Sequence, residues 1–150
     1  MTPATPPTPL DIRAIVVGAG LMGRWHADAA ARAGARVRAI VDPRADRARA
    51  LAARHDGARI VARLEDLEPA GAEVVHVCAP ASDHAALARL ALGTGRHAVV
   101  EKPMGRDTAE TEALLALAGH AGRVLCPVHQ YPFQRGAARV AASFSDLGPV

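Results

Sequence analysis

The 150-residue sequence has little lysine, few aromatic residues and no long hydrophobic run. Lys102 is the single lysine, and the other basic residues are arginines scattered among acidic residues. No basic run is interleaved with aromatic residues, so the composition argues against nucleic-acid binding although the net charge is +3. The longest apolar stretch lies between Arg13 and Arg24 and is shorter than the ~18 residues of a membrane helix. We therefore expect no membrane partner.

Cysteine is scarce as well, with only Cys78 and Cys126, which lie far apart and lack metal-ligand spacing. This usage predicts reduced core thiols, no metal site and a cytoplasmic location. Aromatic residues make up 3% of the chain, so the core must consist of Ala, Val, Leu and Ile. Residues 1–10 are rich in proline and threonine and lack the features of a secretion signal, which predicts a disordered leader.

Short β-branched segments alternate with alanine-rich helical segments along most of the chain. Strands are predicted at 12–17, 36–41, 59–61, 74–78, 98–100 and 124–128, and helices at 21–33, 43–55, 82–92 and 108–121. Such alternation is typical of a parallel sheet with right-handed crossovers and helices on both faces. The predicted fold class is α/β, a doubly wound Rossmann fold in three layers that spans residues 11–143. Ligands of such sheets bind beyond the carboxyl ends of the strands.

The segment GAGLMG between the first predicted strand and helix has the G-x-G-x-x-G pattern of dinucleotide-binding domains. Gly18 would allow the tight turn, Gly20 would let a pyrophosphate approach the backbone, and Gly23 would let helix and strand pack closely. The N–H groups at the helix start, which includes Leu21 and Met22, would face the phosphates. The competing interpretation is a strand-helix turn without a ligand.

Asp42 lies 19 positions after the last glycine of this pattern, at the end of the second predicted strand. Its carboxylate could bind both hydroxyls of the adenosine ribose, whereas the 2′-phosphate of NADP would meet a like charge, so NAD is favoured. Arg44 leaves NADP possible because it could hold that phosphate. Alternatively, Arg44 faces solvent after Pro43.

Longer segments resemble landmarks of the Gfo/Idh/MocA oxidoreductases over about residues 12–150: VGAGLMGRWHA, VDP, CAPASDHAALARLALGTGRHAVVEKPMGRDTAE and VLCPVHQYPF. The pairing of P-x-x-x-H at 80–84 with E-K-P at 101–103 is more specific than the glycine loop. The chain departs at Pro132, where family members often carry an arginine.

The resemblance implies that Lys102 lies beside the nicotinamide and the substrate hydroxyl. It also implies that Glu101, Ala79 and Pro80 lie near the cofactor, and that His84 begins the following helix. The same resemblance suggests a cis peptide bond before Pro103. In the family, an aspartate and a histidine of a second α/β domain complete the proton relay, and that domain usually forms the oligomer.

Residues 144–150 are expected to begin this second domain, whose remainder and oligomer interface would be absent. We therefore expect a domain that binds dinucleotide, with hydride transfer to or from a secondary alcohol of a sugar, cyclitol or similar polyol only when a second domain is present. The alternatives are a non-catalytic dinucleotide-binding module, truncated or split, and an interaction protein that keeps the fold for packing.

Lysine suits the proposed position in E-K-P because its proton is adjustable, whereas an arginine stays protonated. The following proline keeps Lys102 extended at the strand end. The competing interpretation is an ordinary surface lysine. The sequence leaves two alternative roles for each of two other histidines. His129, with Gln130, lines the pocket or is structural, and His26 packs or caps the first helix.

Overall fold

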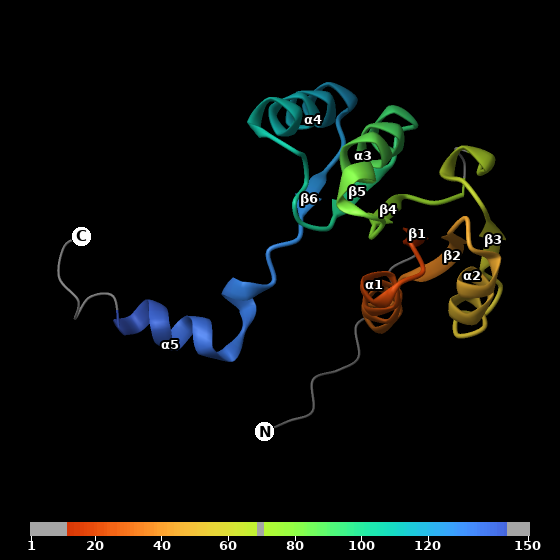
Figure 1. Cartoon of the computed structure of the whole chain (residues 1–150), viewed down its shortest axis with the longest axis horizontal. Coiled ribbons are helices and arrows are strands. Elements are labelled where there is room, and N and C mark those ends of the chain that lie inside the picture. Colours follow the sequence, from red (N-terminus) through yellow and green to blue (C-terminus); the bar gives the residue numbers. More distant parts are fainter. Residues whose placement is uncertain (1–11, 69–70, 144–150) are drawn as a thin grey trace.

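A computed structural model describes residues 12–68 and 71–143 as a single parallel sheet flanked by helices (Figure 1). The six strands run in the order β3-β2-β1-β4-β5-β6, so the sheet order reverses direction at β1. The strands are β1 (Arg13–Val17), β2 (Arg36–Val41), β3 (Arg59–Val61), β4 (Val74–Val77), β5 (His97–Val100) and β6 (Leu125–Pro127). The doubly wound α/β prediction is confirmed, whereas the predictions for residues 1–10 and 144–150 fall outside the described residues.

Helices cover both faces of the sheet because successive strand residues point to opposite sides. On β1, Ile15 and Val17 pack under α3 and α4, while Val16 packs under α1 and α2. These helices contribute mostly alanines, whose small side chains let helix and sheet approach closely. The helices are α1 (Leu21–Arg32), α2 (Ala45–Ala52), α3 (His84–Gly93), α4 (Thr108–Ala121) and α5 (Arg135–Ser143).

Local signals at α4 explain its boundaries. The Asp107 side chain accepts a hydrogen bond of 2.8 Å from the Glu110 amide, which caps the first turn. Gly122 ends the helix in the left-handed conformation with a φ of 61°. Cap and stop residue together account for the predicted span of residues 108–121.

Other elements differ in detail from the sequence prediction. The second helix begins at Ala45, because Arg44 is extended as its N-cap, rather than at Pro43. Three short 3-10 helices were not predicted, and neither was α5, which leads away from the sheet (Figure 1). The 3-10 helices are η1 (Leu64–Asp66), η2 (Ala81–Asp83) and η3 (Tyr131–Phe133). No helix within the described ranges is long and apolar enough to cross a membrane.

The two cysteines differ in environment, which corrects one prediction. Cys78 follows β4 and is half-buried, but Cys126 on β6 is exposed and is not a core residue. Burial, with a smaller contribution from the nearby Glu101, raises the pKa of the Cys78 thiol to about 12. Cys78 is therefore a protonated, unreactive thiol near neutral pH.

Candidate functional site

The glycine loop joins β1 to α1 through two very close backbone approaches. Gly18 has a φ of +96°, and a Cβ there would lie 2.5 Å from the carbonyl oxygen of Cys78. A Cβ on Gly23 would lie 1.7 Å from the carbonyl oxygen of Gly18. Both positions therefore require glycine for packing, independently of any ligand.

Gly20 differs from these two glycines because its requirement is not explained by protein contacts. A Cβ at Gly20 would meet nothing within 4 Å, and the residue is the extended N-cap of α1. The first N–H groups of an α-helix have no partner within the helix, and the helix dipole favours an anion in front of them. Open space above these donors fits the approach of a pyrophosphate to the backbone.

Asp42 is buried at the end of β2 and accepts two backbone hydrogen bonds. Its Oδ2 accepts from the Ala19 amide at 2.8 Å, and its Oδ1 accepts from the Arg44 amide at 2.8 Å. The carboxylate thus ties the glycine loop to the turn before α2, a role the sequence did not predict. Each carboxylate oxygen can accept more than one hydrogen bond, so ribose hydroxyls remain possible partners.

A cleft of about 490 Å³ opens between the ends of β1, β2 and β4, beside the point where the strand order reverses. It brings together Asp42, Arg44, Ala79 and Pro80, which the sequence predicted as cofactor-binding residues. The cleft is also lined by Gly18 and by two arginines that were not predicted, namely Arg47 and Arg63. A dinucleotide site at this edge is what a doubly wound sheet favours.

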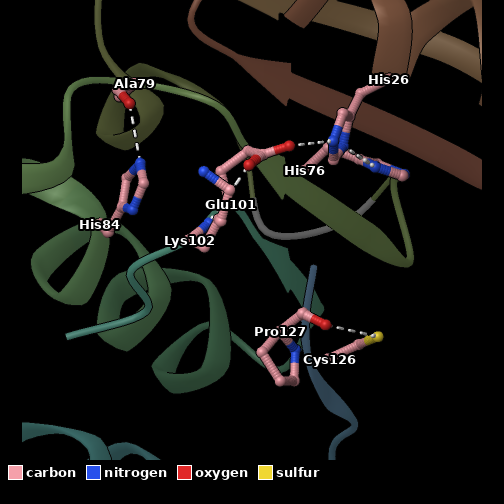
Figure 2. A network of polar contacts seen from close by, with 8 residues as sticks. All are labelled: His26, His76, Ala79, His84, Glu101, Lys102, Cys126 and Pro127. Atoms are coloured by element: carbon pink, nitrogen blue, oxygen red, sulfur yellow. Dashed lines mark hydrogen bonds and ion pairs between the residues drawn. The ribbon is translucent and has the colours of Figure 1, made fainter. Parts of the chain in front are cut away.

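Glu101 lies at the end of β5 on the α1 side of the sheet and is 6% exposed. Its Oε1 lies 3.1 Å from Nε2 of His26 on α1, and its Oε2 accepts from the Lys102 amide at 3.2 Å (Figure 2). His26 therefore neither caps α1 nor merely packs. It connects the first helix to the residue beside the candidate catalytic lysine.

His76 on β4 continues this polar cluster beneath α1. The Nδ1 atoms of His76 and His26 lie 3.1 Å apart, and the rings meet edge to face. Burial, and secondarily the neighbouring His26, lowers the pKa of His76 to about 4, so its ring is neutral near pH 7. Because both rings present Nδ1, one must donate and the other accept.

Lys102 is exposed at the carboxyl end of β5, and the bond to Pro103 is cis, as the family resemblance suggested. Within residues 12–68 and 71–143, no hydrogen bond or ion pair engages its ammonium group. The ammonium is therefore available to a ligand at this edge of the sheet.

His84 is the first residue of α3 and is 2% exposed. Its Nδ1 lies 2.7 Å from the carbonyl oxygen of Pro103 and its Nε2 lies 2.8 Å from that of Ala79. The ring thus spans the loops that follow β4 and β5.

The remaining predicted residues divide between the two sides of the glycine loop. Leu21 is exposed and lines a second groove with Gly20 and Arg24, outside the cleft that contains Asp42. His129 is exposed and Gln130 is half-buried, and neither lines that cleft.

No three histidine, cysteine or acidic side chains gather as metal ligands in the part of the chain that the structure describes.

Sequence reasoning left His26 and His76 out of the site. A signal for His26 was present, because it follows Gly23 by three positions and so shares the helix face that packs on the sheet. His76 alternates with the buried Val75 and Val77, which places it on the opposite face of β4, under α1.

Comparison with known proteins identifies relatives for most of the chain. A family model described as "Oxidoreductase family, NAD-binding Rossmann fold" matches residues 12–129. Inositol 2-dehydrogenase of Leifsonia xyli is 40% identical over 110 residues, which are 71% of this chain and 32% of the relative. UDP-N-acetylglucosamine 3-dehydrogenase of Acidithiobacillus ferrooxidans is 34% identical over 136 residues, 85% of this chain and 42% of the relative.

Solved structures show the same fold with nicotinamide cofactors bound. GenD2 from gentamicin A biosynthesis, in complex with NAD, has a TM-score of 0.85 at 28% identity, covering 95% of this chain and 41% of that one. KijD10, a 3-ketoreductase from Actinomadura kijaniata in complex with NADP, has a TM-score of 0.80 at 30% identity, covering 91% and 43%. The chain thus spans about two fifths of the length of these proteins.

Proposed function

The chain belongs to the Gfo/Idh/MocA oxidoreductases, and on that premise we propose that it is the dinucleotide-binding part of an enzyme that moves hydride between a nicotinamide and a secondary alcohol. NAD binding is the family property that the matched domain carries. The alcohol belongs to a sugar, cyclitol or similar polyol. Inositol and UDP-N-acetylglucosamine, named for the relatives, are both of this kind.

The observation that carries the proposal is the pairing of a free lysine with a dinucleotide cradle on one edge of the sheet. Lys102 lies two residues after the end of β5, and no described side chain bonds to its ammonium group. Gly20 leaves open space at the N-terminus of α1 on the same edge. Hydride transfer between a nicotinamide and an alcohol requires a site that binds the dinucleotide and a group beside the alcohol that can handle its proton. The α1 N-terminus and Lys102 offer these two features.

Each residue of the site has a separate role in this proposal. The α1 N-terminus and Gly20 bind the pyrophosphate, and Asp42 binds the adenosine ribose. NAD held by these residues would supply the hydride chemistry. Lys102 stabilises the negative charge that grows on the alcohol oxygen and takes part in transfer of its proton. Glu101 holds the Lys102 amide from the α1 side.

A second candidate is a non-catalytic dinucleotide-binding module. It is favoured by the site itself, because no acidic or histidine side chain among the described residues is bonded to the Lys102 ammonium and could relay its proton. In either case we expect the 150 residues by themselves to bind dinucleotide but to turn over little or no polyol, because the family resemblance assigns part of the proton relay to a second domain.

Binding is tested by titration calorimetry of the chain with NAD and with NADP. Gly20→Val should abolish NAD binding while leaving the fold intact, because a Cβ there meets no protein atom within 4 Å and the branched side chain would occupy the space in front of the α1 N-terminus. Gly119→Ala is the matched control, since a Cβ there also meets nothing within 4 Å but lies in α4. Absence of binding by the unaltered chain at millimolar ligand would instead favour the interaction protein.

Activity separates the two remaining candidates. Oxidation of myo-inositol followed through nicotinamide absorbance is expected to be negligible for the isolated 150 residues. Robust turnover by them would contradict the expectation that a second domain is required. If a fused or co-expressed second domain from a relative restores turnover, Lys102→Ala should abolish that turnover and leave NAD affinity nearly unchanged.

A further inference from the structure

His84 has an unusual hydrogen-bonding environment for a buried histidine. Both of its ring nitrogens face main-chain carbonyl oxygens, Pro103 at 2.7 Å and Ala79 at 2.8 Å (Figure 2 shows the latter contact). The side chain is 2% exposed, so water does not compete for either nitrogen. Both distances are short for hydrogen bonds between nitrogen and oxygen.

A carbonyl oxygen can only accept a hydrogen bond, whereas a neutral imidazole has a single N–H and a lone pair on its other nitrogen. A neutral His84 would therefore satisfy one carbonyl and point a lone pair at the other. Burial makes such an unpaired contact costly. Both contacts are favourable only when each ring nitrogen carries a hydrogen.

We propose that His84 is an imidazolium clamp that donates to the carbonyls of Ala79 and Pro103 and so fixes the loops after β4 and β5 relative to each other. The first carbonyl lies directly before Pro80, and the second lies directly after Lys102–Pro103. His84 is thus a positioning residue for Lys102 and not a catalytic one. The role of His84 in positioning Lys102 rests on the proposed function. The protonation of the His84 ring does not depend on that function.

The segments that meet at the ring carry four other titratable groups. Asp83 precedes His84 on η2, Glu101 and Lys102 precede Pro103 after β5, and Cys78 precedes Ala79 after β4. The Glu101 carboxylate contacts His26 and the Lys102 amide, and the exposed Asp83 accepts a hydrogen bond from the Ser82 hydroxyl, so the ring's hydrogen-bond partners are the two carbonyl oxygens alone. Lys102 is exposed, so its ammonium is screened by water from the buried imidazole.

The protonation is tested on the unaltered chain by nitrogen-15 NMR of the histidine rings near pH 7. An imidazolium gives two similar ring nitrogen shifts, each coupled to its own hydrogen, whereas a neutral ring gives two widely separated shifts. We expect the first pattern for His84, assigned by its absence in His84→Gln. A widely separated pair at His84 would overturn the proposal. This readout is independent of NAD and of turnover.

The clamp is tested by hydrogen exchange on the same variant. Glutamine can donate its amide to only one region at a time, so we expect the backbone amides of residues 79, 81, 102, 104 and 105 to exchange about tenfold faster, with NAD binding weakened by about the same factor. His120→Gln, exposed on α4, is the control and should change neither. Unchanged exchange at both loops in His84→Gln would also overturn the proposal.

The two proposals fail in distinguishable ways. If the unaltered chain does not bind NAD but shows the imidazolium pattern and a loosened pair of loops in His84→Gln, the clamp stands and the proposed function fails. If NAD binds to the unaltered chain and His84 is neutral, the reverse holds. Should His84→Gln fail to fold, the ring spectrum of the unaltered chain decides the protonation, and NAD affinity of His84→Asn decides the clamp.

Discussion

His76 makes the stability of this chain sensitive to mild acid. Its pKa of about 4 in the folded protein is lower than the 6.5 of an unperturbed histidine, mainly because of burial and then because of His26. The unfolded chain therefore takes up a proton more readily, so the stabilisation is complete above about pH 6.5 and is lost as the pH falls towards 4. Between about pH 7.5 and pH 5, we expect His76 to account for a loss of about 2 kcal/mol in the free energy of unfolding.

Urea unfolding of His76→Gln at both pH values measures this contribution. Glutamine cannot be protonated, so the variant should lose about 2 kcal/mol less than the unaltered chain over the same interval. His120→Gln removes an exposed histidine from α4 and serves as the control for general titration. An equal acid loss in the unaltered chain and His76→Gln would show that His76 is not held neutral.

Asp42 combines a structural and a proposed ligand-binding role, and these can be separated. Asp42→Asn keeps one backbone hydrogen bond but turns an amide donor towards the other N–H, which should cost about 1–3 kcal/mol of stability. The same change removes the charge that would repel a 2′-phosphate, while Arg44 and Arg47 remain in the cleft. We therefore expect the affinity for NADP relative to NAD to rise about tenfold or more.

Calorimetric titration with both dinucleotides checks this expectation. The control is Asp46→Asn, which removes an equal charge from an exposed position on α2 that is paired only loosely with Arg44, at 3.8 Å. It should change the ratio of the two affinities little, because exposed charges are screened. A ratio unaltered by Asp42→Asn, together with lowered stability, would mean that Asp42 only holds the turn.

At the scale of elements, the close packing of α1 against the sheet depends on one glycine. A Cβ on Gly23 would lie 1.7 Å from a backbone oxygen of Gly18, which cannot rotate away, so Gly23→Ala must displace α1. We expect a loss of about 1–3 kcal/mol or more in the free energy of unfolding, measured in urea. His26 lies on the same helix, so its contact with Glu101 should also be disturbed.

Gly119→Ala is the comparison for this prediction, because it adds the same methyl group to a helix where nothing lies within 4 Å. There the change should stabilise the chain by about 0.5–1 kcal/mol, since glycine is a poor helix residue. Equal stability of Gly23→Ala and the unaltered chain would contradict the close packing of α1 against the glycine loop.

The main elements were predictable because each carries a local signal. The buried run before Gly18 ends at a glycine, and α4 has Asp107 at its start and Gly122 at its end. The start of α2 was less well predicted. The Asp42 carboxylate binds the Arg44 amide, so Arg44 stays extended and the helix begins at Ala45 rather than at Pro43. Such a side-chain contact depends on where β2 ends in space and leaves no periodic pattern in the sequence.

The candidate site was predictable in part for a related reason. Residues at strand ends could be assigned to one edge of the sheet, which brings Asp42 and Pro80 to a common cleft. The cluster of His26, His76 and Glu101 was not predictable, because it joins a helix to two strands across 75 residues of chain. Single histidines within apolar segments do not indicate which of them will meet.

At the scale of the whole molecule, the proposed ligand links two halves of one sheet. The central strand β1 pairs with β2 on one side and β4 on the other, and the cleft is lined from both sides. We therefore expect the chain to unfold in a single thermal transition that NAD shifts as a unit.

Ligand at about 100 times its dissociation constant contributes about 2.7 kcal/mol, which corresponds to a rise of roughly 5–10 °C in the unfolding midpoint. Gly20→Val should show no shift, because it blocks binding without touching the core. Two transitions, of which NAD raises only one, would instead mean that the β1–β3 and β4–β6 halves unfold separately.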